Sequence, residues 1–449
     1  MNSLDPLGLT LILGLWTIVA FGLWMQRARS PLHMATLALV VTGLIGSFYP
    51  LVTSFVEPSS WRNLDVLSPA IVRDTQQQYV AYAAGLVLAI LASNSGRRNA
   101  SAALDSRDTT ARDFTASALL VGAGLTMYGI YAERVGMSAL TDREDYAAKY
   151  LASQGLGPLQ LGLPMAMAGC LWAEASELAA ARKLPFRAVA LAIVVWSIAF
   201  ISVRTNAVVV VLGYASILAR RSGFELRKIR PALVIAGLVG YLFLESFALL
   251  RGVYRGDLGS AISQVIDRGE LALGTAVGGS ELSHPFITAA EVLRSREAGE
   301  LAGESLWDGV AACLPRGIHP DRPPFLSEQF VRSNYAELAS RGGGAAFSLV
   351  AEAWLDFGSW IGPFAFGLAL GWLLVACERR RETHPTGLVA RVLPYFVFYV
   401  AMQHRNEFGS LFKQVFMLSL VVVPVWLLAE ALSHSPRRAR ALHPQRGRS

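Results

Sequence analysis

Three arginines at the ends of apolar stretches are the first residues of this sequence that could do chemistry. Arg204 lies in Ile-Ser-Val-Arg-Thr-Asn between two apolar runs, and Arg251 and Arg255 follow a third run. A guanidinium at a membrane edge is expensive unless it is paired or hydrated, and its forked donors match phosphate oxygens. We therefore predict that Arg204 binds a diphosphate, with snorkelling to lipid headgroups as the alternative. Arg251 and Arg255 would share one face of a continuing helix, either as functional residues or as interfacial anchors.

A proline-rich stretch later in the chain concentrates ionisable side chains. Residues 314–324 read Leu-Pro-Arg-Gly-Ile-His-Pro-Asp-Arg-Pro-Pro and place Arg316, His319, Asp321 and Arg322 within seven residues. Prolines fix the backbone and reduce the entropy that is lost when neighbouring side chains are held in place. The adjacent arginines and aspartate favour a functional role for His319. A surface loop in the polyproline conformation is the alternative.

Two carboxylates follow on a short apolar segment. Glu352 and Asp356 in Ala-Glu-Ala-Trp-Leu-Asp are spaced i, i+4, so a helix would present both on one face. Paired carboxylates suit a general base and a partner that shifts its pKa. They would equally mark the water-facing side of that helix, and the spacing does not decide between the two.

The sequence lacks the motifs of several other chemistries. It has no Asp-x-Asp pair at a membrane edge, no Walker motif, no His and Cys cluster at metal-ligand spacing and no Ser nucleophile elbow. These absences argue against ATP-driven or metal-driven chemistry. We therefore predict no cofactor and no metal, and positive charge for a diphosphate would come from arginine.

The composition indicates a polytopic membrane protein. The chain has 449 residues, of which 53% are hydrophobic and 16% charged, whereas about 25% are charged in an average soluble domain. The net charge of +7 suggests nucleic acid only superficially, because the basic residues cluster in short loops between apolar runs. Its three cysteines are too few and too scattered for a disulfide framework.

The apolar runs predict an all-α fold with about eleven membrane spans in a single transmembrane domain over residues 1–449. The spans cover roughly 7–25, 32–56, 77–94, 114–132, 158–175, 187–203, 205–219, 231–250, 360–378, 388–403 and 411–432. The first run lacks a basic region before it and a cleavage site after it, so we expect a retained helix. The sixth and seventh are short and would form either a tight helical hairpin or one broken helix.

The distribution of Lys and Arg predicts the orientation. The loops 26–31, 94–113, 176–187, 220–230 and 379–391 and the basic tail 433–449 together hold 23 Lys and Arg residues, and the short loops on the other side hold eight. Because positive residues favour the cytoplasmic side, the first set is predicted to be cytoplasmic. The N-terminus and the large loop 251–345 would then face outward.

The large loop itself is too apolar for a disordered linker. Leu306, Trp307 and Val310 follow the i, i+3, i+4 pattern of an amphipathic helix. His284-Pro285 begins a second helical stretch, in which Pro285 suits the first turn. We expect these helices to lie on or dip into the outer leaflet.

Three motifs resemble the bacterial O-antigen and exopolysaccharide repeat-unit polymerases of the Wzy type. The proline-rich stretch is similar to the family's Pro-Arg and Trp-Pro-x-Lys-Pro pattern, with His319 in place of Trp and Arg322 in place of Lys. Ser-Leu-Val-Ala-Glu-Ala-Trp-Leu-Asp-Phe-Gly resembles the family's Glu-Ala-Tyr and Phe-Gly entry into the next span. Ser-Val-Arg-Thr-Asn resembles a Ser-Arg-Gly region shared with O-antigen ligases, with the Ser displaced by one and the Gly missing.

This resemblance implies a GT-C-like, metal-independent glycosyltransferase of the bacterial inner membrane whose active site faces the periplasm. It would join undecaprenyl-diphosphate-linked repeat units, in contact with the lipid bilayer and with a chain-length regulator and a flippase as further partners. The diphosphate would be bound by five arginines, and one of three residues would deprotonate the acceptor hydroxyl. The arginines are Arg204, Arg251, Arg255, Arg316 and Arg322, and the candidate catalytic residues are Glu352, His319 and Asp356.

Two other functions remain as alternatives. An O-antigen ligase of the same architecture would transfer glycan to the lipid A core, with His319 or His284 as its base. A lipid-linked oligosaccharide flippase or transporter would carry charged residues deep in several spans and show repeat symmetry. Glu245 is the main residue of that kind here, and the sequence contains no visible repeat.

Overall fold

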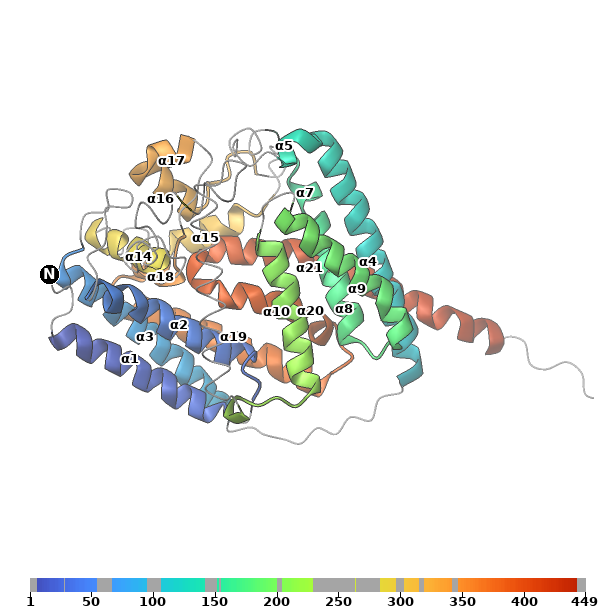
Figure 1. The fold of residues 1–449 in the computed structure, drawn as a ribbon, viewed down its shortest axis with the longest axis horizontal. Helices are drawn as coiled ribbons and strands as arrows, with labels where there is room; N and C mark the ends of the chain where they lie inside the picture. Colours follow the sequence, from blue (N-terminus) through green and yellow to red (C-terminus); the bar gives the residue numbers. More distant parts are fainter. Residues whose placement is uncertain are drawn as a thin grey trace, which may run out of the picture.

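The protein is a bundle of α-helices in this computed structural model, which describes residues 6–27, 29–54, 67–94, 106–141, 152, 155–199, 204–228, 263, 283–295, 303–314, 319–340 and 346–441 (Figure 1). All regular elements in these ranges are helical, which confirms the predicted all-α class for them. The α-helices are α1 (Pro6–Met25), α2 (Met34–Thr53), α3 (Pro69–Asn94), α4 (Ser106–Val135), α5 (Met137–Thr141), α7 (Gly157–Gln160), α8 (Gly162–Ala175), α9 (Ala180–Ala199), α10 (Arg204–Arg221), α14 (Ser283–Ser295), α15 (Glu304–Ala311), α16 (Leu326–Asn334), α17 (Ala336–Ser340), α18 (Leu349–Phe357), α19 (Ile361–Thr383), α20 (Leu388–Ala401) and α21 (Phe408–Ala441). Two short 3₁₀ turns, η1 (Leu226–Lys228) and η2 (Gln403–Arg405), complete them.

Five of the described helices are long and apolar enough to cross a membrane. They are Pro6–Met25, Met34–Thr53, Thr109–Val135, Ile361–Thr383 and Phe408–Ser433. Helix α20 is apolar but shorter. A hydrocarbon core about 30 Å thick needs roughly 20 apolar residues, so these helices are those of a multi-pass membrane protein.

The predicted spans can be compared with the helices one by one. Ten of the eleven coincide with a described helix, and the eighth, 231–250, lies outside the described residues. Helix α3 begins at Pro69 and not at Gln77, because hydropathy marks where a helix enters lipid and not where it starts. The sixth and seventh spans are the separate helices α9 and α10. Asn206 Nδ2 donates to Ser197 Oγ at 3.3 Å between them, so they form a hairpin.

The buried apolar side chains form two clusters that meet at α20. The first draws on α1, α2, α3, α14, α18 and α19, and the second on α4, α8, α9, α10 and α21. Leu393 and Val397 of α20 belong to the first cluster, while Tyr395 and Phe398 belong to the second. Figure 1 shows the first group of helices on the left and most of the second on the right. Helix α20 therefore joins the two halves.

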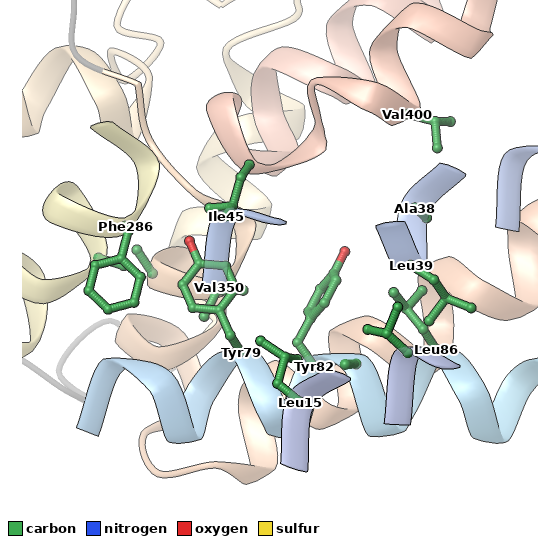
Figure 2. Close-up of a cluster of buried hydrophobic side chains, with 14 of the residues drawn as sticks. Leu15, Ala38, Leu39, Ile45, Tyr79, Tyr82, Leu86, Phe286, Val350 and Val400 are labelled. Carbon is green, nitrogen blue, oxygen red and sulfur yellow. The ribbon is translucent and has the colours of Figure 1, made fainter. Parts of the chain in front are cut away.

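Helix α14 shows that part of the predicted external loop belongs to the core. Phe286 of this helix is 0% exposed, and its ring stacks on those of Tyr49 and Tyr79 at 5.5 and 5.8 Å between centroids. Figure 2 shows Phe286 alongside Tyr79 in the first cluster. Pro285 lies in the first turn of the helix, as predicted. This helix is packed between other helices and is not laid on the membrane surface.

Helix α15 confirms the predicted amphipathic helix, but its buried face is not the apolar one. Trp307 is 74% exposed, whereas Ser305 and Gly309 are buried. In a membrane protein an apolar stripe can face lipid, while small and polar residues make the contacts between helices. Trp307 of the apolar stripe therefore points away from the bundle, while Leu306 and Val310 are half-buried.

The connections between helices gather at two ends. Helices α1 and α10 end at the lower end in Figure 1, and the segments that follow them are in contact. The Leu226 backbone N–H donates to the Arg29 carbonyl at 2.7 Å, and Arg29 pairs with Glu382. Arg112 Nη2 donates to the Thr386 carbonyl at 2.7 Å at the same end. The loops 26–31, 220–230 and 379–391 and the first turns of α4, which the Lys and Arg count assigned to one side, thus meet there. The upper end carries α15, α16, α17 and the turn between α20 and α21.

Candidate functional site

Helix α18 positions the two carboxylates that the sequence singles out. Ser348 caps its N-terminus, because Ser348 Oγ accepts the Val350 backbone N–H at 3.1 Å. Gly358 ends it at a φ of 62°, a conformation that glycine adopts without strain. Glu352 and Asp356 are 0% and 1% exposed between these two ends. They share one face, as their spacing predicts, and that face meets α15.

Asp356 binds the N-terminus of α15. The backbone N–H of Ser305 donates to Asp356 Oδ1 at 3.3 Å, and Ser305 Oγ donates to Oδ2 at 2.6 Å. The N-terminus of a helix carries partial positive charge and unpaired N–H groups, so a carboxylate there is stabilising. Asp356 therefore fastens α15 to α18.

Glu352 binds the N-terminus of α21 in the same way. The backbone N–H of Phe408 donates to Glu352 Oε2 at 2.6 Å. Glu352 Oε1 lies 3.1 Å from Ser305 Oγ, so one serine contacts both carboxyl groups. The two acids of α18 thus link two helices that are far apart in the sequence.

Glu407 adds a third buried carboxyl group at the upper end. Its Oε1 accepts from Ser327 Oγ at 2.9 Å and from Ser410 Oγ, and its Oε2 accepts the Ser327 backbone N–H. Ser327 is in the first turn of α16, and Glu407 directly precedes α21. This residue therefore joins the N-termini of α16 and α21.

Burial raises the pKa of all three carboxyl groups. The pKa of Glu352 rises to about 8, first because of desolvation and then because Glu407 and Asp356 are nearby negative charges. The pKa values of Asp356 and Glu407 are also raised, again mainly by burial, while their hydrogen bonds to Ser305 and Ser327 oppose the rise. Glu352 is therefore mostly protonated at neutral pH.

A polar pocket of about 220 Å³ opens beside this cluster. Its walls come from the end of α15, the proline-rich stretch and the first turns of α16. The lining residues are Ala312, Arg322, Pro323, Pro324, Phe325, Glu328 and Arg332. Small-molecule sites usually have about 300–1,000 Å³, so this pocket would hold only part of a large substrate.

Arg322 is held in the pocket wall by the end of α15. Its Nη1 donates to the carbonyl oxygens of Ala312 and Leu314, both at 3.0 Å. Carbonyl groups at a helix C-terminus lack partners within the helix and attract cations. Both of these bonds leave from Nη1. The Nη2 and Nε donors of the planar guanidinium point in other directions and are not used in these two bonds.

Lys413 brings a further cation to the pocket. Its Nζ lies 5.2 Å from the centre of the Phe325 ring, which lines the pocket. It is within electrostatic reach of Arg322 and Glu328. Two basic side chains, Arg322 and Arg332, thus line the pocket together with the single carboxylate Glu328, and Lys413 adds a third positive charge beside the Phe325 ring.

A second buried polar group supports α18 from below. His404 is fully buried, and its Nε2 lies 2.9 Å from Thr42 Oγ1. Its Nδ1 lies 3.5 Å from Oγ of Ser348, the cap of α18, which also lies 3.3 Å from the Tyr79 hydroxyl. Desolvation lowers the pKa of His404 to about 3, so its ring is neutral. These contacts join α2, α3 and the α20–α21 turn to the helix that carries the acids.

The structure places the predicted site residues in three groups. Glu352 and Asp356 meet through Ser305, and Arg322 lines the pocket. His319 is half-buried near Arg322, whose backbone N–H donates to its carbonyl at 3.3 Å. Arg204 is the first residue of α10, at the helix end opposite to Arg220 and Arg221. The residues Arg251, Arg255 and Arg316 lie outside the described residues.

Four residues of this site were not singled out from the sequence. They are Ser305, Glu328, Arg332 and Lys413. The i, i+4 spacing of Glu328 and Arg332 was a readable signal, because it predicts an ion pair on one helix face. No local sequence pattern marks Ser305 or Lys413, because the residues that they contact are distant in the sequence. Within the described ranges, no three His, Cys, Asp or Glu side chains are grouped as metal ligands.

A protein-family model matches part of the chain. Residues 330–434 match the family model described as O-antigen polysaccharide polymerase Wzy. The predicted Wzy-type resemblance is confirmed. No match to the chain was found among curated proteins or among solved structures. The Wzy region runs from α16 to α21, so it contains both acids of α18, Glu407 and Lys413. The match supports O-antigen polymerisation as the general activity.

Proposed function

We propose that this chain polymerises undecaprenyl-diphosphate-linked oligosaccharide repeat units into O-antigen or exopolysaccharide, as a metal-independent membrane glycosyltransferase. The Wzy match supports the polymerase class. The observation that carries the substrate class is the pocket with Arg322 and Arg332 in its wall and Lys413 beside it. A departing diphosphate carries negative charge, and cations fixed in advance around it stabilise the transition state.

We propose that the five arginines predicted to bind the diphosphate do so, and that Arg322 makes the main contact. The carbonyls that hold its Nη1 fix the guanidinium without neutralising it. Lys413 would oppose it across Phe325. The other predicted ligands, Arg204, Arg251, Arg255 and Arg316, would approach from neighbouring segments at the same end.

Two of the three predicted catalytic residues have a positioning role in this proposal and not a catalytic one. Each carboxyl oxygen of Glu352 and Asp356 already has a hydrogen-bond partner, and both side chains are fully buried. A general base must reach the acceptor hydroxyl directly or through one water. We therefore assign these two acids to positioning α15 and α21 behind the pocket. His319 stays a candidate base.

The proposed setting follows from the distribution of charge. The lower end holds the Arg- and Lys-rich loops, so it would face the cytoplasm and the pocket would face the periplasm. The enzyme would then lie in the inner membrane as a GT-C-like bundle of eleven spans. A flippase would deliver the lipid-linked repeat unit to this side, and a chain-length regulator would act on the product.

A complementation experiment tests this function. In a strain that lacks the gene and makes lipid-linked repeat units, the wild-type chain should restore long glycans. Arg322→Ala should leave single repeat units and lower polymer yield at least about 100-fold, the loss typical of one missing electrostatic contact to a transition state. Arg322→Lys should recover part of the activity. Glycans would be separated on gels, with protein abundance measured in the same membranes.

The matched control is Arg380→Ala, which removes an exposed arginine at the lower end. It should leave chain length unchanged. Long polymer of normal yield in Arg322→Ala would exclude the diphosphate role. Loss of single repeat units from the lipid A core in the strain without the gene would instead identify a ligase.

A further inference from the structure

Glu328 is the carboxylate that lines the pocket. Its side chain is 38% exposed, whereas Glu352 and Asp356 are fully buried outside the pocket lining. It shares the pocket of about 220 Å³ with Arg322 and Arg332. A substrate that enters this space therefore meets Glu328 before it could meet the acids of α18.

The hydrogen bonds of Glu328 leave one oxygen available. Its Oε1 accepts from Arg332 Nη2, one turn further along α16. Among the residues that the structure describes, Oε2 has no hydrogen-bond partner. An ionised carboxylate has about four acceptor sites, so Oε2 can accept a hydroxyl proton while Oε1 stays paired.

The surroundings of Glu328 are fixed on both sides. Glu407 holds the preceding residue, Ser327, through its backbone and its hydroxyl. Gln329 Nε2 donates to the Pro324 carbonyl at 2.9 Å, which ties the proline-rich wall to the same helix turn. Catalytic groups need such support, because an error of about 1 Å in position lowers the rate strongly.

We propose that Glu328 is the general base that activates the acceptor hydroxyl in the polymerisation reaction; this assignment rests on the function proposed above. The hydroxyl proton passes to Glu328 Oε2 as the acceptor oxygen bonds to the anomeric carbon of the donor sugar. The bond from that carbon to the phosphate oxygen breaks, and the lipid diphosphate leaves with the electron pair. Arg322 and Lys413 balance its charge, and the protonated Glu328 then releases its proton to water.

An ordinary structural role for Glu328 makes a different prediction. An acid in the first turn of a helix stabilises the helix dipole, and an exposed i, i+4 ion pair adds about 0.3–0.5 kcal/mol. Both effects concern stability alone. The ion pair would be lost equally when Arg332 is replaced, whereas the carboxylate in the first turn of the helix would remain.

The experiment compares Glu328→Gln with Arg332→Gln in membranes supplied with purified lipid-linked repeat units. Glu328→Gln should lower kcat by about 100-fold or more with KM changed less than about threefold, as expected for a lost general base. Arg332→Gln should lower kcat by less than about 10-fold. Glu328→Asp should recover part of kcat. Glu337→Gln, an exposed acid of α17, serves as the control and should behave as wild type.

The outcomes separate this assignment from the function on which it rests. If wild-type protein forms no polymer from lipid-linked repeats, the proposed function itself fails. If wild type is active and Glu328→Gln keeps its kcat, Glu328 is not the base. Equal losses in Glu328→Gln and Arg332→Gln with lowered thermal stability would reduce Glu328 to an ion-pair partner and overturn the proposal.

Discussion

At the scale of single residues, Ser305 constrains how the buried acids are protonated. Its Oγ lies 2.6 Å from Asp356 Oδ2 and 3.1 Å from Glu352 Oε1. A hydroxyl has one proton to donate, so both contacts are hydrogen bonds only if one carboxyl group donates in return. The raised pKa of Glu352, about 8, makes it the donor at neutral pH. Three neighbouring acids can be buried together because at least one is uncharged.

The pH dependence of stability should therefore change in Glu352→Gln. The folded state holds a proton on Glu352 up to about pH 8, while the unfolded chain loses it near 4.5, so stability falls as pH rises through this window. The slope would be at most about 1.4 kcal/mol per pH unit. Glutamine stays neutral and can donate to Ser305, so its unfolding temperature in detergent should fall less between pH 6 and 9.

The control for this measurement is Glu337→Gln, which replaces an exposed acid with the same amide. Its stability should follow the wild-type pH profile. Parallel profiles for wild type and Glu352→Gln would show that Glu352 does not carry this proton.

The sequence predicts that Glu352 and Asp356 share a helix face, but it does not predict the residues that they contact. The i, i+4 spacing of Glu352 and Asp356 predicts their common face, because that geometry is local to one helix. It does not predict Ser305 and Phe408, which lie about 50 residues before and after them. Whether a carboxylate is open to solvent or closed by such partners depends on these distant contacts. For the same reason, the local pattern around Glu328 does not reveal that its side chain lines the pocket.

At the scale of elements, the site depends on a close crossing of α15 and α21. A Cβ atom added to Gly409 would lie 2.7 Å from the Cα of Gly309, and 3.1 Å from the Phe325 ring. Cys313 Sγ also donates to the Gly309 carbonyl at 3.1 Å on the same side of α15. Glycines allow helix backbones to approach in this way. The crossing sets where α15 ends, and the end of α15 holds Arg322.

Gly409→Ala should consequently weaken both stability and activity. The new methyl group meets backbone and not a flexible side chain, so α15 must move. Overpacking of this kind costs about 1–3 kcal/mol, which lowers the unfolding temperature. Displacement of the Ala312 and Leu314 carbonyls should shift Arg322 and reduce polymer yield roughly 10-fold, in line with a misplaced catalytic contact.

Gly14→Ala is the matched control, because a Cβ atom there meets nothing within 4 Å. In this helix interior alanine should be neutral or slightly stabilising. Equal behaviour of the two variants, measured by thermal unfolding in detergent and by glycan gels, would show that the crossing is not a tight contact.

The elements themselves were largely predictable, and their contacts were not. Apolar runs located most of the long helices, and five of these are long and apolar enough to cross a membrane. Periodicity located α15, but it does not reveal that Ser305 and Gly309 are the residues of this helix that face the bundle. Helix α14 was expected at the membrane surface, and only the packing of Phe286 on Tyr49 and Tyr79 reveals its place in the core.

At the scale of the whole molecule, an ionic network at the lower end fastens the second half of the bundle. Glu174 of α8 accepts from Arg187 Nε and from Arg221 Nη1, both at 2.8 Å. Nearby, Arg391 Nη2 of α20 donates to Asp113 Oδ2 of α4 at 2.7 Å. Sequence counting treats these arginines only as topological signals. The structure shows that they also pair with buried acids, which a count of positive charges does not consider.

The two ends of the bundle should face opposite sides of the membrane. Asp321 is exposed at the upper end near the pocket, and Arg380 is exposed at the lower end. In a chain whose three native cysteines are replaced by alanine, Asp321→Cys should react with a membrane-impermeant maleimide in cells with a permeabilised outer membrane. Arg380→Cys should react only after the inner membrane is opened, because the Lys- and Arg-rich end stays in the cytoplasm. The cysteine-free chain should not react under either condition. Labelling of Arg380→Cys in cells with an intact inner membrane would reverse the orientation and place the pocket in the cytoplasm, where the lipid-linked repeat unit has not yet been flipped.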